Sequence, residues 1–198
     1  MINSKTAIAN LASICNILNI NNTKHWLQDG TLLGLYRDKN FISHDTDTDM
    51  GILFETFNPK VFESFKRCGF KVYHVFGYVE DSLEIGLIKD GLKTDLFFHY
   101  KNGPSQYHCA FTGSNYTRRV DFIYDQFDTK MMSFQGTDFP VPEDVLKFIL
   151  TKYGEDWSTP DEKWNYATSP KNHKLTDIYF DKNISANKFN TWVQGLQK

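Results

Sequence analysis

The chain has 198 residues, with 22 Lys and Arg against 24 Asp and Glu, so its formal net charge is -2, and 40% of the residues are hydrophobic. This length suits one domain with a substantial core, and the composition lacks the low hydrophobicity and high net charge of disordered chains. The near-neutral balance also lacks the cationic excess of proteins that bind nucleic acid regardless of sequence. We therefore expect no nucleic-acid partner.

The first 20 residues carry apolar side chains at helical spacing, which predicts an amphipathic helix rather than the core of a signal peptide. No apolar run approaches the ~20 residues that a membrane-spanning helix needs. The three cysteines lie far apart without CxxC spacing, so we expect free thiols in a reducing compartment. These features predict a cytoplasmic protein without a signal peptide, membrane anchor or transmembrane segment.

Strand and helix signals alternate between residues 25 and 69. The predicted elements are a strand at 25–28, a helix that opens at the Asp29-Gly30-Thr31 turn and runs to Tyr36, a strand at 47–54, and a helix at 60–68 that Gly69 ends. From residue 70 to about 124, a period of two and many aromatic residues indicate strands. These strands are expected at 70–76, 82–88, 92–100 and 107–111, with Asp90-Gly91 as a hairpin turn.

The remaining signals complete the expected fold. Apolar residues after Pro142 predict a helix at 143–153, whereas the chain beyond Trp157 is polar and is expected to wrap the surface without a core of its own. No internal repeat or low-complexity linker divides the chain, which indicates a single domain. The pattern predicts the α+β class, with a mixed or antiparallel sheet and helices packed on it.

The densest chemical signal is the acidic run from His44 to Met50. In an extended chain, Asp45, Asp47 and Asp49 lie on one face, where their carboxylates repel one another. A hard divalent cation such as Mg²⁺ or Mn²⁺ relieves this repulsion, because such ions prefer oxygen ligands. A solvated acidic edge strand is the alternative, although aspartate is depleted in strands.

Asp95 lies in the middle of a strongly apolar predicted strand. A carboxylate is rarely buried without a partner, so we expect either a cation near Asp95 or an ion pair with Lys93 or an arginine. If this strand neighbours the acidic one, Asp95 joins Asp47 and Asp49 in a three-carboxylate site for one or two metal ions. Such sites hold the attacking and leaving oxygens in phosphoryl transfer.

A glycine-containing turn precedes the acidic run. Glycine lets a backbone approach a phosphate closely, and a helix N-terminus offers free N–H groups and the positive end of a dipole. Gly30 and Thr31 are therefore candidate phosphate contacts, and Arg37 could offer a charge to the same phosphates. A plain tight turn, and a surface ion pair between Arg37 and Asp38, are the alternatives.

Several motifs follow one another in a fixed order along the chain. They are Gly30-Thr31-Leu32-Leu33-Gly34, Arg37, Phe41-Ile42, Asp45 to Ile52, Gly77 to Glu84, Lys93 to Phe98, Val141-Pro142, Tyr153 to Trp157, Pro160 and Trp164. Their order and composition resemble the LicD/fukutin family of the DNA polymerase β-like nucleotidyltransferase superfamily. The resemblance covers roughly residues 26–170, and the stretch at 79–84 points to the fukutin branch. Ser43-His44 departs from the proline and aromatic residue that the family usually has there.

The resemblance implies a single catalytic domain over residues 1–198. This domain would comprise an N-terminal helix at 1–21, a nucleotidyltransferase-like core at 22–165 and a polar C-terminal tail at 166–198. The implied reaction moves ribitol phosphate, glycerol phosphate or phosphocholine from a CDP-activated donor to a hydroxyl of a glycan or polysaccharide acceptor, and releases CMP. Mg²⁺ or Mn²⁺ would be the cofactor.

The resemblance also assigns roles to particular residues. The catalytic residues would be Asp45, Asp47, Asp49 and Asp95, with Asp47, Asp49 and Asp95 holding the metal, Asp45 or Asp95 accepting the acceptor's proton, and Gly30, Thr31 and Arg37 binding the diphosphate of the donor. The same carboxylates would serve a nucleotidyltransferase that uses an NTP and releases pyrophosphate. A catalytically inactive glycan- or nucleotide-binding module is a further alternative, and the presence of all four aspartates argues against it.

Overall fold

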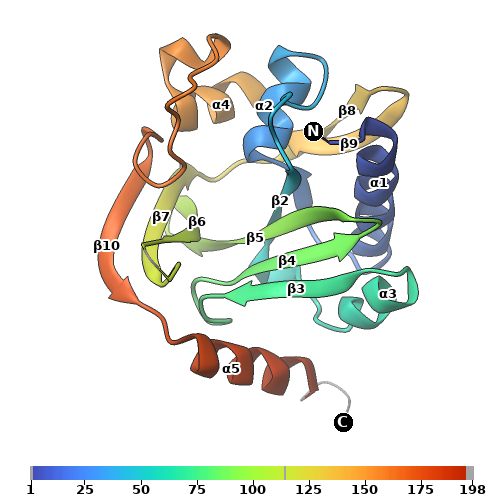
Figure 1. Ribbon diagram of the computed structural model, residues 1–198, viewed down its shortest axis with the longest axis vertical. Helices are drawn as coiled ribbons and strands as arrows, with labels where there is room; N and C mark the ends of the chain where they lie inside the picture. The colour runs from blue at the N-terminus through green and yellow to red at the C-terminus, as the bar shows by residue number, and fades with distance from the viewer. Residues whose placement is uncertain (1, 114, 195–198) are drawn as a thin grey trace.

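The computed structural model describes residues 2–113 and 115–194 and has an α+β fold (Figure 1). The helices are α1 (Ser4–Ile20), α2 (Asp29–Arg37), α3 (Val61–Arg67), α4 (Val145–Tyr153) and α5 (Lys182–Gln194), with short 3₁₀ helices η1 (Phe54–Thr56) and η2 (Glu155–Ser158). The strands are β1 (His25–Leu27), β2 (Asp47–Leu53), β3 (Lys71–Phe76), β4 (Glu84–Lys89), β5 (Leu92–Asn102), β6 (Ser105–Thr112), β7 (Arg118–Asp125), β8 (Thr129–Phe134), β9 (Thr137–Pro142) and β10 (His173–Tyr179).

Eight of these strands form one mixed sheet. Its order is β1-β2-β5-β6-β7-β10, and β4 also pairs with β5 and carries β3 at its outer edge. β2 and β5 run parallel, whereas the other described pairs are antiparallel. β5 is long enough to pair with β2 and β4 along its first part and with β6 at its end, so it joins the two halves of the sheet. The predicted mixed sheet of an α+β fold is confirmed.

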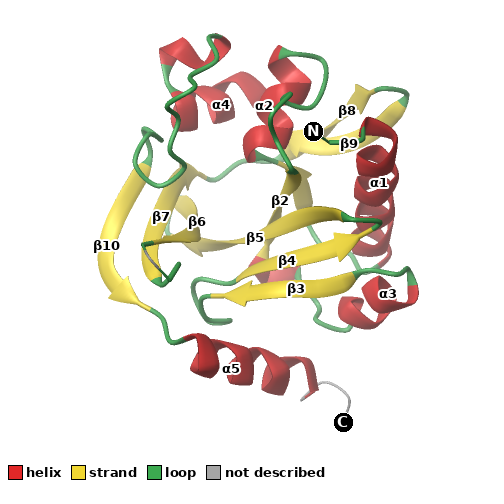
Figure 2. Ribbon diagram, in the orientation of Figure 1, coloured by secondary structure: helices red, strands yellow, loops and turns green. Residues whose placement is uncertain are grey.

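The helices lie around the sheet, as Figure 2 shows. α1 forms because Asn3 caps its first turn, where the Asn3 side chain accepts a hydrogen bond from the Thr6 N–H at 3.0 Å. Leu11, Ile14 and Leu18 then place one apolar stripe in the main core. Among the described residues, no helix combines the length and the apolar character needed to cross a bilayer.

The predicted helices and strands up to residue 112 are confirmed within a few residues, whereas several later elements were not predicted. β7 alternates buried and exposed side chains, but the sequence analysis named no strand there. The hairpin of β8 and β9 turns at Gln135 and Gly136, which both have positive φ.

The segment that was predicted to be a polar C-terminal tail, at 166–198, contains β10 and α5. β10 pairs antiparallel with β7, and α5 packs against β3. Phe180 and Phe189 from this segment are buried in the hydrophobic clusters of the domain. β10 was missed because most of its side chains are exposed, so its sequence has no hydrophobic period.

Candidate active site

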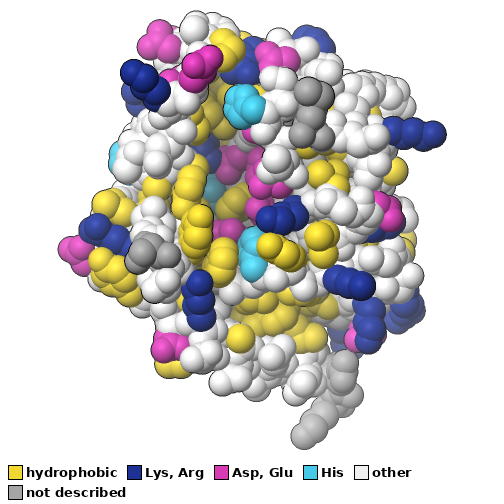
Figure 3. All heavy atoms as spheres, viewed as in Figure 1, with side chains coloured by type: hydrophobic (Ala, Val, Ile, Leu, Met, Phe, Trp, Pro, Cys, Tyr) yellow, Lys and Arg dark blue, Asp and Glu magenta, His cyan; other side chains and the backbone are white. Residues whose placement is uncertain are grey.

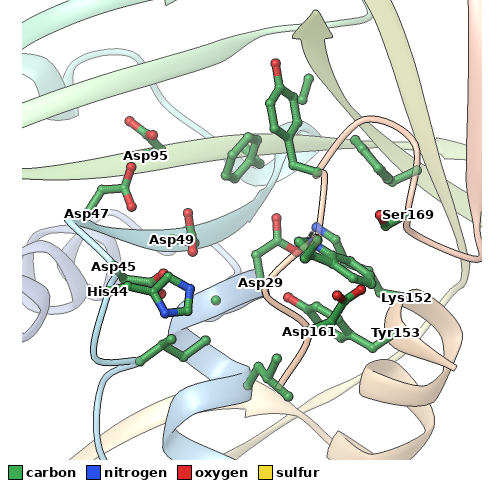
Figure 4. A pocket seen from close by; sticks show the side chains of 18 of the residues that line it. Asp29, His44, Asp45, Asp47, Asp49, Asp95, Lys152, Tyr153, Asp161 and Ser169 are labelled. Carbon is green, nitrogen blue, oxygen red and sulfur yellow. Dashed lines mark ion pairs between the residues drawn. The ribbon is translucent and has the colours of Figure 1, made fainter. Parts of the chain in front are cut away.

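A cavity of about 1430 Å³ opens on the face of the sheet that carries the acidic strand. Its lining comes from α2 and the segment that joins it to β2, from strands β2 to β7, and from α4 together with the chain that follows it. Figure 3 shows acidic side chains at the bottom of a hollow on this face, with hydrophobic side chains along one wall. Figure 4 shows the labelled aspartates inside the cavity.

The parallel pairing of β2 and β5 builds the carboxylate group at the bottom of this cavity. Asp49 lies directly opposite Asp95, and Asp47 lies opposite Lys93. Because side chains alternate between the two faces of a strand, Asp47, Asp49 and Asp95 share the face that lines the cavity. The expectation that Asp95 lies beside Asp49, although it is 46 positions further along the chain, is confirmed.

Asp45 reaches the same cavity from a different element. β2 begins at Asp47, and Asp45 lies in the irregular segment before it rather than in the extended run that the sequence analysis expected. Its side chain is 23% exposed and lines the cavity. Asp45 therefore stands outside the row of strand carboxylates but faces the same space (Figure 4).

The first turn of α2 is hydrogen-bonded to the acidic strand β2. The Thr31 hydroxyl accepts a hydrogen bond from the Asp49 N–H at 2.8 Å, and the Thr31 N–H points at Asp49 Oδ2 at 3.3 Å. A side chain at position 30 would be crowded, since a Cβ there would lie 2.8 Å from Asp45 Oδ2. Gly30 thus lets the helix approach the carboxylates, and the Thr31 amide serves Asp49 in this structure.

Arg37 forms the surface ion pair with Asp38 and also faces the cavity, so both arrangements predicted from the sequence are present. Its guanidinium forms a two-pronged ion pair with Asp38, with Nε to Oδ1 at 2.7 Å and Nη2 to Oδ2 at 2.8 Å. The same side chain lines the cavity and is only 12% exposed. Its charge therefore borders the space where a donor would lie.

Burial raises the pKa of the four aspartates of the site. For Asp49, the negative charges of Asp29 and Asp47 add to burial and hold the pKa of the carboxyl well above its ordinary value. For Asp95, burial and then the charge of Glu84 raise the pKa to about 7. The protein thus holds several carboxylates in a place where their charges are costly.

The donor set fits a hard divalent cation. Three strand carboxylates face one space, and Asp95 Oδ1 is buried without a hydrogen-bond partner among the described residues. Mg²⁺ and Mn²⁺ prefer oxygen ligands of this kind, and the positive charge of such an ion would offset the cost of burying these carboxylates.

Sequence reasoning missed other groups in the cavity. The buried Lys152 of α4 forms an ion pair with Asp29 at the start of α2, and His74 and Glu84 lie beside Asp95. A signal for Lys152 was present, because a lysine shares the apolar face of the helix at 145–153. No comparable signal marked His74 or Glu84, whose positions depend on the pairing of distant segments.

Comparison with known proteins identifies the family of this chain. Residues 22–144 match the family model described as LicD/FKTN/FKRP, nucleotidyltransferase domain. The ribitol-5-phosphate transferase FKTN of Homo sapiens is 31% identical over 155 residues, which are 78% of this chain and 33% of that protein.

Two uncharacterized proteins are also similar. One from Caenorhabditis elegans is 28% identical over 196 residues, covering 91% of this chain and 51% of the relative. One from Rickettsia typhi is 34% identical over 163 residues, covering 80% of this chain and 47% of the relative. The chain thus spans about a third of the length of the FKTN relative and about half that of the other two. The match to the family model covers more than half of the chain and includes Asp45, Asp47, Asp49 and Asp95, and the chain belongs to the LicD/FKTN/FKRP nucleotidyltransferase-domain family.

Proposed function

We propose that this chain is a metal-dependent transferase that moves a phosphorylated alditol or phosphocholine from a CDP-activated donor to a glycan hydroxyl and releases CMP. The observation that carries the proposal is the row of Asp47, Asp49 and Asp95 at the bottom of a large cavity, in a chain of this family. The relative FKTN is a ribitol-5-phosphate transferase, so ribitol phosphate is the first group to test.

Asp47, Asp49 and Asp95 would hold Mg²⁺ or Mn²⁺. When bound, such an ion supplies positive charge that stabilises the negative charge that develops on the transferred phosphoryl group. Placement of the donor and acceptor together with charge stabilisation accounts for most of the catalysis in such reactions, so the residues need not form a covalent intermediate.

The other residues of the cavity would orient the two substrates. Gly30 and Arg37 line the cavity and would contact the diphosphate of the donor, whereas the buried Thr31 acts by fixing Asp49. Asp45 stands outside the metal-binding row and is partly exposed, so it is suited to accept the proton of the attacking hydroxyl. The hydroxyl oxygen attacks the phosphorus that carries the transferred group, and the bond to the CMP oxygen breaks.

A donor panel tests this function. The protein is incubated with MgCl₂, a mixture of glycan acceptors, and CDP-ribitol, CDP-glycerol or CDP-choline in turn, and CMP is measured by chromatography. We expect CMP from at least one donor, none in EDTA, and none from Asp49→Asn. Pyrophosphate release from an NTP without CMP from any CDP donor would instead identify the nucleotidyltransferase alternative.

A further inference from the structure

A second group of metal-ligating side chains shares Asp95 with the proposed cation site and adds His74 and Glu84, which have no role in the proposed transfer. It consists of His74 on β3, Glu84 on β4 and Asp95 on β5, whose ligand atoms all lie within 4.8 Å of one another. Glu84 Oε1 is 3.3 Å from His74 Nε2, and Asp95 Oδ1 is 3.8 Å from the same nitrogen.

The register of the strands places His74 beside Asp95. Asp49, Asp95, Gly86 and His74 form one row across β2, β5, β4 and β3. A Cβ on Gly86 would lie 2.5 Å from the His74 ring and 3.0 Å from Asp95 Oδ1. Only a residue without a side chain lets the imidazole lie across β4 and reach the carboxylate on the next strand.

The polar atoms of this group are poorly satisfied by the protein itself. His74 Nε2 and Asp95 Oδ1 are buried and make no hydrogen bond within the described part of the chain, and His74 Nε2 meets Glu84 and Asp95 only as an ion-pair partner, at 3.3 and 3.8 Å. Glu84 is 7% exposed, and a buried carboxylate is expensive unless a cation or a hydrogen-bond donor meets it. The 3.3 Å between Glu84 Oε1 and His74 Nε2 is short enough for both atoms to bind one ion.

We propose that His74, Glu84 and Asp95 would hold a second divalent cation, with Asp95 shared between this site and the cation site of Asp47 and Asp49. One imidazole nitrogen with two carboxylates suits a transition ion such as Mn²⁺ or Zn²⁺ better than Mg²⁺, which favours oxygen ligands throughout. His74 lines the cavity, so an ion can reach the site from solvent. The site shares Asp95 with the proposed function but does not depend on the identity of the donor or acceptor.

Counting bound Mn²⁺ tests this site without measuring activity. Protein stripped with EDTA is dialysed against MnCl₂, and bound Mn²⁺ is counted by metal analysis and by the loss of the free-ion EPR signal. We expect about two Mn²⁺ per chain in the wild type and one in His74→Gln, with the affinity for the second ion weakened on the order of tenfold or more. His44→Gln is the matched control, because His44 borders Asp45 in the same cavity but lies outside the group, and it should retain both ions.

A second variant distinguishes loss of the cation site from misfolding of His74→Gln. Gly86→Ala leaves all three ligands in the chain but displaces the His74 ring, so it should also bind one Mn²⁺, and circular dichroism checks that both variants fold. One Mn²⁺ in the wild type that is lost in Asp47→Asn and retained in His74→Gln would overturn the second site and leave the first in place. Two Mn²⁺ in His74→Gln would overturn it as well. No bound Mn²⁺ in the wild type would overturn both sites.

Discussion

In the metal-free protein, Asp95→Asn should stabilise the fold above neutral pH. The Asp95 side chain is 15% exposed, and burial together with the charge of Glu84 raises the pKa of its carboxyl from 3.8 to about 7. The folded protein then binds this proton more tightly than the unfolded chain does, so the free energy of unfolding falls as pH rises from 3.8 to about 7. The carboxyl binds its proton roughly a thousandfold more tightly in the folded than in the unfolded protein. At ~1.36 kcal/mol for each tenfold, the charged carboxylate lowers the free energy of unfolding by roughly 4 kcal/mol.

Urea unfolding in EDTA measures this cost. An amide at position 95 avoids it, so at pH 8 Asp95→Asn should exceed the wild type by up to roughly 4 kcal/mol, or about 10 °C in Tm for a chain of this length. At pH 5 the difference should shrink to less than half, because the wild-type carboxyl is then protonated in the folded state. MnCl₂ should stabilise the wild type more than the variant, since selective binding to the folded state raises stability.

Asp138→Asn on β9 provides the control, because Asp138 is exposed and lies outside the cavity lining. This variant should show no pH-dependent difference from the wild type. If Asp95→Asn is no more stable than the wild type at pH 8, or if its advantage is the same at pH 5, the electrostatic account of the site is wrong.

Four further substitutions probe the proposed chemistry. Asp47→Ala and Asp49→Ala should each reduce CMP release to background while circular dichroism stays unchanged, and turnover within tenfold of wild type would contradict their role as metal ligands. Arg37→Ala should raise the KM for the donor more than it lowers kcat, because a diphosphate contact acts in the ground and transition states alike; unchanged kinetics would leave only its surface ion pair. Gly30→Ala should lower activity because its Cβ, 2.8 Å from Asp45 Oδ2, would displace that carboxylate, while stability should change by less than about 1 kcal/mol, since the end of the partly exposed Asp45 side chain can move; activity equal to that of the wild type would contradict this packing.

The fold was predictable where a strand consists largely of buried apolar residues. β4 and β5 have this property. β10 lacks it, because β10 is held by backbone pairing with β7 and exposes most of its side chains. A strand whose sequence is polar on both faces leaves no hydrophobic signal to detect.

The candidate site was predictable where a residue conflicts with its surroundings. A lone aspartate in an apolar strand identified Asp95, and three aspartates at alternate positions identified the acidic strand. His74 and Glu84 carry no such conflict in the sequence. Their proximity to Asp95 depends on the order β5-β4-β3 and on the missing side chain of Gly86, which are properties of the folded sheet.

The register that aligns the carboxylates is fixed by the opposite face of the same strands. Thr48 and Thr94 lie opposite each other on that face, both almost fully buried, and their hydroxyls are 2.8 Å apart in a hydrogen bond. The next pair along, Met50 with Leu96, belongs to the main core. A slip of one residue in either strand would turn its core side chains toward the cavity and its aspartates toward the core. The apolar packing that stabilises β2 against β5 therefore also holds Asp49 beside Asp95, against the repulsion between them.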